Sequence, residues 1–117
     1  VMTSYNKVNG VWSHYHYELV TEILRNEWGY DGLVITDWWM QEGESREFPN
    51  LRNDAVRVRA QVDVLMPGVI GEEGDLSART LVPSLRDPDG VTRCEAQRCA
   101  LNVIRFIERV MHATGKA

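Results

Sequence analysis

Three short apolar runs, each followed by a segment with helical spacing, constrain the fold of this chain more than any other feature. The runs are residues 1–5, 32–36 and 62–66. Apolar, β-branched runs of this length are typical of strands that are buried in a parallel sheet. Strand and helix alternate three times with no sign of antiparallel hairpins. The pattern therefore predicts an α/β architecture with parallel strands and right-handed crossovers.

A helix is expected after each of the first two runs. Apolar residues recur at helical spacing over residues 17–28, and Gly29 stands where a C-terminal cap would lie. The segment 50–60 carries apolar residues toward its end, and Asn50 is suited to cap its first turn. Each strand with its helix makes one βα unit.

The third unit has a longer connection. Residues 69–91 are rich in Gly, Pro and Asp, which predicts a long loop. Thr92 and Glu95 form a capping-box pair, and apolar residues then mark one face of a helix that reaches Gly115.

Composition narrows the class of protein. The chain has 117 residues with a formal net charge of -4, and 44% of its residues are hydrophobic, as in one soluble globular domain. Its basic residues are scattered, so nucleic acid is not an expected partner, and no apolar run is long enough to predict a membrane span. Cys94 and Cys99 are five residues apart in a predicted helix and are expected to be free thiols. Free thiols favour a reducing, cytoplasmic location.

Asp37 is the leading candidate for chemistry. It ends the second apolar run and precedes Trp38 and Trp39, so its carboxylate is expected at a pocket mouth beside aromatic faces. Sugar rings stack on aromatic faces, and a carboxylate there can attack or stabilise an oxocarbenium-like centre. A second interpretation is that Asp37 caps a following helix. The residues alone leave both interpretations open.

Three segments resemble family 3 glycoside hydrolases. Residues 1–10, VMTSYNKVNG, resemble the family segment VM-x-x-YN-x-VNG. Residues 24–38 resemble LR-x-EWG-[FY]-DG-x-V-x-[ST]-DW, and residues 62–68, VDVLMPG, resemble the segment that contains the last barrel strands and loops. The resemblance covers nearly the whole chain and implies the C-terminal part of the family's (β/α)8 barrel domain.

The resemblance also implies roles for three residues. Asp37 matches the catalytic nucleophile, Trp38 matches an aromatic wall of the glucose subsite, and Tyr5 matches a tyrosine near the nucleophile. The implied reaction is retaining hydrolysis of terminal, non-reducing β-D-glucosyl or β-xylosyl residues of O-glycosides. The implied partner is a carbohydrate, and no cofactor is expected.

Parts of the family's site have no counterpart in this sequence. The chain contains no Lys-His pair of the kind that holds the sugar hydroxyls, and the proton donor of two-domain members lies in a later domain. Glu42 and Glu44 follow Asp37, but a charged loop is usually solvated. The isolated chain is therefore expected to be inactive.

Other polar residues show weaker patterns for binding. His14 and His16 alternate in what reads as an extended loop, but no third metal ligand follows at a suitable spacing, so no metal site is predicted. Lys7 is expected to extend along the surface. The segment 71–75, GEEGD, lacks the Lys-Ser or Lys-Thr of a phosphate-binding loop.

Together these observations predict one partial domain over residues 1–117, a C-terminal section of the family's N-terminal barrel domain. It would hold three βα units of a TIM-type (β/α)8 barrel that remains incomplete, because a whole barrel needs about 250 residues. The alternative is a small α/β module that binds sugar, or is purely structural, without catalysis.

An incomplete barrel would expose a strand edge with unpaired N–H and C=O groups, which favours pairing with another copy. We therefore predict a homo-oligomer that forms through this edge. Light scattering at high protein concentration should give a mass above that of the 13.4 kDa chain. A mass equal to that of one chain would contradict the prediction.

Overall fold

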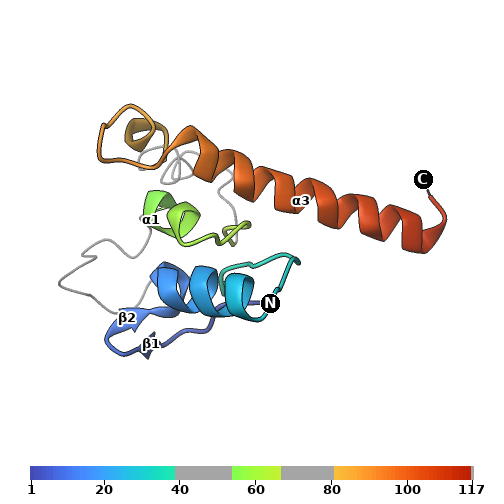
Figure 1. Cartoon of the computed structure of the whole chain (residues 1–117), viewed down its shortest axis with the longest axis horizontal. Helices are drawn as coiled ribbons and strands as arrows, with labels where there is room; N and C mark the ends of the chain where they lie inside the picture. Colours follow the sequence, from blue (N-terminus) through green and yellow to red (C-terminus); the bar gives the residue numbers. More distant parts are fainter. Residues whose placement is uncertain (39–53, 67–80, 117) are drawn as a thin grey trace.

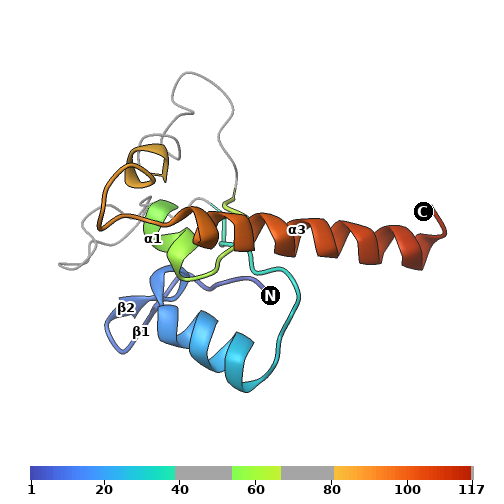
Figure 2. The same cartoon turned by 45° about the horizontal axis from the view of Figure 1, so that its top comes forward.

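Over its described residues, the fold combines helices with an antiparallel hairpin and parallel extended segments (Figures 1 and 2). The computed structural model describes residues 1–38, 54–66 and 81–116. The elements, in chain order, are β1 (Lys7–Val8), β2 (Val11–Trp12), the 3-10 helix η1 (Ser13–Tyr15), the π-helix η2 (Glu18–Glu27), α1 (Asp54–Arg59) and α3 (Arg93–Thr114). Within the described ranges, no helix combines the length and apolar character that crossing a membrane requires.

The hairpin β1–β2 was not predicted. Lys7 pairs with Trp12 and Val8 with Val11, in antiparallel register. Between the strands, Asn9 and Gly10 have φ angles of 50° and 86°, the two left-handed positions of a tight hairpin turn. The expectation of no hairpin is therefore wrong. The Asn9-Gly10 pair favours this turn strongly.

The three predicted strands do lie side by side in parallel. Isolated parallel bridges join Met2 to Ile35 and Ile35 to Val64, so the second run lies between the other two. The Thr3 N–H donates to the Ile35 carbonyl at 2.8 Å. Helices and parallel segments together confirm the α/β class. Three complete βα units of a parallel barrel are not confirmed, because the only extended strands among the described residues are the antiparallel β1 and β2.

Side chains explain why the parallel pairing between the second and third runs is short. The Val34 N–H donates to the Asp63 carboxylate at 2.9 Å, and the Met66 N–H donates to the Thr36 hydroxyl at 2.7 Å. Both donors would otherwise be available to a backbone carbonyl of the neighbouring segment. The ladder is therefore closed by side chains at both ends.

The predicted helix over residues 17–28 is confirmed, but with π geometry. The Trp28 N–H donates to the Ile23 carbonyl, five residues earlier, at 3.0 Å. Gly29 has φ 66°, the left-handed conformation expected of a C-terminal cap. Val20 is buried, whereas Trp28, the last residue of the predicted helix, is 74% exposed.

The capping box of α3 is confirmed. The Glu95 N–H donates to the Thr92 hydroxyl at 3.2 Å, and the Thr92 N–H donates to the Glu95 carboxylate at 2.6 Å. Gly115 ends the helix at φ 65°. The predicted apolar face is covered only in part, because Cys99 is buried while Ile107 is 50% exposed. In both views the C-terminal half of α3 extends past the other elements (Figures 1 and 2).

Two further predictions fall partly outside the described residues. The helix expected over residues 50–60 is present as α1, while its predicted cap, Asn50, lies outside them. Residues 81–84 are helical, so the prediction of one long loop over residues 69–91 is wrong at this point. Of the rest of that segment, residues 85–91 are described, and residues 69–80 lie outside the described residues.

Two apolar clusters lie in the core of the described part of the chain. One joins α1 to the start of α3, and the other joins η2 to the parallel segments. Their buried members are Ala55, Val58, Val91 and Cys99 in the first and Val20, Val34 and Val62 in the second. Both cysteines are free, as predicted, and Cys94 is exposed. Burial, together with the nearby Asp63 carboxylate, raises the pKa of the Cys99 thiol to about 12.

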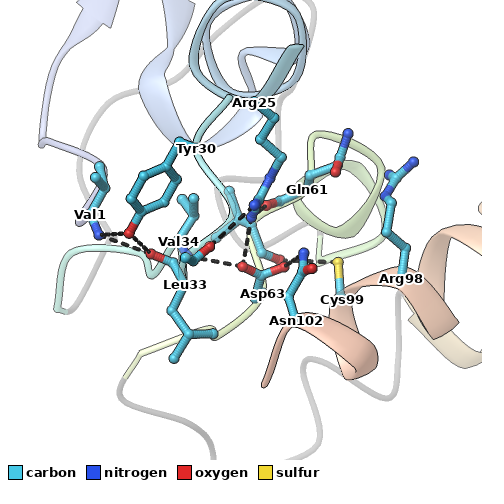
Figure 3. A network of polar contacts seen from close by, with 12 residues as sticks. Val1, Arg25, Tyr30, Leu33, Val34, Gln61, Asp63, Arg98, Cys99 and Asn102 are labelled. Carbon is cyan, nitrogen blue, oxygen red and sulfur yellow. Dashed lines mark hydrogen bonds and ion pairs between the residues drawn. The ribbon is translucent and has the colours of Figure 1, made fainter. Parts of the chain in front are cut away.

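A buried polar network centred on Asp63 joins the elements (Figure 3). One carboxylate oxygen accepts from Arg25 at 2.7 Å and from the Val34 N–H at 2.9 Å. The other accepts from the Asn102 amide at 2.9 Å. Arg25 also donates to the carbonyls of Gly32, at 3.1 Å, and Gln61, at 3.0 Å. One carboxylate therefore connects η2, α3 and the central parallel segment.

The contribution of the Arg25–Asp63 ion pair to stability depends on its burial. The side chains of Asp63 and Arg25 are 0% and 8% exposed, whereas those of Asp31 and Arg109, which form a second Asp–Arg pair, are 70% and 54% exposed. Water screens the exposed pair, and such pairs contribute little to stability. Removing one partner of a buried pair instead leaves an uncompensated charge.

We predict that Asp63→Asn destabilises the chain by about 3–5 kcal/mol, because it leaves the Arg25 guanidinium buried without a counter-charge. Urea denaturation followed by circular dichroism measures this free energy. The matched control is Asp31→Asn, which removes the exposed pair and should leave the denaturation midpoint nearly unchanged. Equal shifts in the two variants would contradict the assignment of Asp63 as the central support.

Candidate active site at the ends of the parallel segments

Asp37 lies at the carboxyl end of the central parallel segment, two residues beyond the bridged Ile35. Its carboxylate is half-buried and accepts a hydrogen bond from the Trp38 N–H at 2.6 Å. Side chains alternate between the two faces of extended backbone. Asp37 is therefore on the face of Ile35, while Thr36, which is 0% exposed, points to the opposite, buried face.

The register of the parallel segments brings the other predicted site residues to the same end. Met2 is level with Ile35, so Tyr5 follows three residues beyond the bridge on the neighbouring segment. Tyr5 is 36% exposed and Trp38 is 48% exposed, which leaves both aromatic side chains accessible. Trp39 lies outside the described residues. The three residues predicted to form the site thus share the carboxyl end of the parallel segments.

Thr36 is a residue that the sequence interpretation missed. Its hydroxyl accepts from the Met66 N–H, and its own N–H donates to the Val64 carbonyl at 3.0 Å. These bonds join the segment that carries Asp37 to its neighbour, at the end where Asp37 lies. The signal in the sequence was a single hydroxyl residue inside an apolar run, immediately before the candidate carboxylate.

The two histidines are not on an extended loop, so that expectation is wrong. His14 is within η1 and is 0% exposed, with its ring centroid 4.3 Å from that of Tyr15. His16 accepts from the Leu19 N–H through Nδ1 at 3.3 Å, at the start of η2. Over residues 1–38, 54–66 and 81–116, no three His, Cys, Asp or Glu side chains are grouped to hold a metal ion.

Of the remaining candidates, only Lys7 is among the described residues. The Lys7 ammonium lies 5.0 Å from the centroid of the Trp12 ring, a cation–π contact. Lys7 is exposed, in agreement with its predicted place on the surface. Glu42, Glu44 and the segment 71–75 lie outside the described residues.

Solved structures with a similar fold are β-glucosidases. A β-glucosidase from Paenibacillus barengoltzii aligns with a TM-score of 0.70 at 40% identity, over 90% of this chain and 12% of that protein. A GH3 β-glucosidase from Bifidobacterium adolescentis aligns with a TM-score of 0.70 at 27% identity, over 96% of this chain and 14% of that protein.

Sequence comparison leads to the same group of proteins. A β-glucosidase from Ruminococcus albus is 42% identical over 107 residues, which are 92% of this chain and 11% of that protein. The chain thus spans about a tenth of the length of this relative. Residues 1–70 match the family described as the "Glycosyl hydrolase family 3 N terminal domain".

This match also corrects one expectation. The sequence interpretation located the chain in the C-terminal part of the barrel, whereas the matching description is that of the family's N-terminal domain. The match covers more than half of the chain and includes Tyr5, Asp37 and Trp38. The chain therefore belongs to glycosyl hydrolase family 3, and residues 1–70 belong to the N-terminal domain of that family.

Proposed function

We propose that this chain carries the catalytic nucleophile, Asp37, of a retaining β-glucosidase. The observation that supports the proposal most is the position of Asp37: a half-buried carboxylate at the carboxyl end of the central parallel segment. Catalytic residues of (β/α)8 enzymes come from the carboxyl ends of the strands. The resemblance of this chain to β-glucosidases supports a glucoside as the substrate.

The proposed reaction has two displacement steps. The Asp37 carboxylate attacks the anomeric carbon, and the bond from that carbon to the leaving oxygen breaks as the oxygen takes a proton from a general acid. Water then attacks the same carbon and releases Asp37, while its proton returns to the group that acted as the acid. Two inversions leave the β configuration unchanged.

The two aromatic residues at this end of the sheet have separate proposed roles. Trp38 offers an exposed ring against which the apolar face of a glucosyl or xylosyl residue can stack. The Trp38 N–H also holds one oxygen of Asp37, which limits the rotation of the carboxylate. Tyr5 would contact the sugar or the nucleophile from the neighbouring segment. Terminal, non-reducing β-D-glucosyl or β-xylosyl groups are the proposed substrates.

We further propose that the chain is one partial domain of a longer (β/α)8 enzyme. The parallel order of its three segments, with the central one between the others, supports this placement. A retaining enzyme needs a second carboxylate at about 5 Å from the first. We place that carboxylate outside this chain, which spans 11% of the Ruminococcus albus relative. The isolated chain is expected to be inactive.

The test uses a chimera, defined as the Ruminococcus albus β-glucosidase with this chain in place of its matching segment. We predict that the chimera releases p-nitrophenol from its β-glucoside and that Asp37→Ala lowers kcat by about 10⁴-fold or more, because the nucleophile is lost. Azide should restore release in Asp37→Ala and give the α-glucosyl azide, since a single displacement inverts the anomeric carbon. The isolated chain, assayed beside the chimera, should release none.

The matched control is Asp31→Ala. The Asp31 carboxylate is exposed and lies before the parallel segment rather than at its carboxyl end. This variant should keep the activity of the chimera. Activity that survives Asp37→Ala would show that another group is the nucleophile.

A further inference from the structure

We propose that Thr36 is a positioning residue, whose hydroxyl fixes the carboxyl end of the central segment and thereby orients the neighbouring Asp37 carboxylate. The inference depends on the proposed role of Asp37 as the nucleophile. It adds a residue that does not touch the sugar and acts only through its neighbour.

Two hydrogen bonds place Thr36 at the junction of the central and third segments. Its hydroxyl accepts from the Met66 N–H at 2.7 Å, and its backbone N–H donates to the Val64 carbonyl at 3.0 Å. The side chain is 0% exposed, so water cannot replace the hydroxyl as the acceptor. One residue therefore holds the neighbouring segment through both its backbone and its side chain.

The position of this junction makes it relevant to Asp37. Thr36 and Asp37 are consecutive residues on opposite faces of extended backbone, so a change in the backbone angles of Thr36 turns the Asp37 side chain directly. Among the described residues, the Asp37 carboxylate accepts a 2.6 Å hydrogen bond from the Trp38 N–H, and that donor is on the next residue. Displacement of a reacting group by about 1 Å can cost about 100-fold in rate.

Three substitutions of Thr36 separate the effect of its hydroxyl from the effect of its size. Valine has nearly the shape of threonine but cannot accept a hydrogen bond, so Thr36→Val removes only the proposed function of the hydroxyl. Serine keeps the hydroxyl, so Thr36→Ser should keep the contact with Met66. If Thr36→Val does not fold, Thr36→Ala removes the same oxygen without adding a methyl group.

Thr21 offers a matched control. It is also buried, at 3% exposure, and its hydroxyl also forms hydrogen bonds: it accepts from the Gln61 side chain at 3.0 Å and donates to the Ala60 carbonyl at 3.2 Å. These bonds join η2 to the residues that follow α1, and neither involves the segment that carries Asp37. Thr21→Val therefore reproduces the loss of a buried hydroxyl without affecting the proposed junction.

The first measurement uses NMR on the 117-residue chain. In Thr36→Val, the Met66 amide should exchange with solvent faster, and the Trp38 amide signal, which reports the hydrogen bond to Asp37, should shift. Thr36→Ser and Thr21→Val should leave both signals close to those of the unchanged chain. An unchanged Trp38 signal in Thr36→Val would overturn the inference.

The second measurement uses kinetics in the chimera. Thr36→Val should lower kcat by about 10- to 100-fold with KM changed less than about threefold, since sugar binding is kept and the nucleophile is misplaced. Thr36→Ser should restore kcat, and Thr21→Val should affect thermal stability but not kcat. If Asp37→Ala abolishes activity while Thr36→Val keeps it, the inference fails and the proposed function stands. If Asp37→Ala stays active, the proposed function itself fails.

Discussion

The buried carboxylate of Asp63 joins parts of the chain that are far apart in sequence. Taking a charge out of water is costly, and the fold offsets the cost with an arginine from η2, a backbone N–H from the central segment and an amide from α3. These three groups come from parts of the chain up to 77 positions apart, Arg25 and Asn102 being the extremes. Because these groups bind the same carboxylate, η2 and α3 are both linked to the segment that ends at Asp37.

The same segment is held at its two ends by side chains rather than by a continuous backbone ladder. Asp63 takes the Val34 N–H at one end, and Thr36 accepts from Met66 at the other. Backbone pairing between these contacts is limited to isolated bridges. These contacts fix the register of the segment against its neighbour. A fixed register suits the proposed role of Asp37, whose carboxylate must reach the anomeric carbon of the sugar.

Sequence patterns predicted the features that depend on local interactions. The cap at Thr92 and Glu95, the left-handed glycines and the order of the apolar runs follow from steric and hydrogen-bonding rules within a few residues. The Asp63 network could not be predicted, because a polar residue in an apolar run does not reveal partners that lie far away in sequence. For the site, the end of the sheet that holds Asp37 was predictable from strand order, whereas the contact from Thr36 to Met66 required the register between two segments.

As the proposed nucleophile, Asp37 forms a covalent bond to the sugar, and trapping that bond tests this role directly. The chimera would be treated with 2-deoxy-2-fluoro-β-D-glucosyl fluoride, whose fluoride leaves without a proton donor and whose glycosyl ester is hydrolysed slowly. We expect mass spectrometry of the digested protein to find the sugar on the peptide that contains Asp37, attached to its carboxylate. Attachment to a different carboxylate, with Asp37 unlabelled, would contradict it.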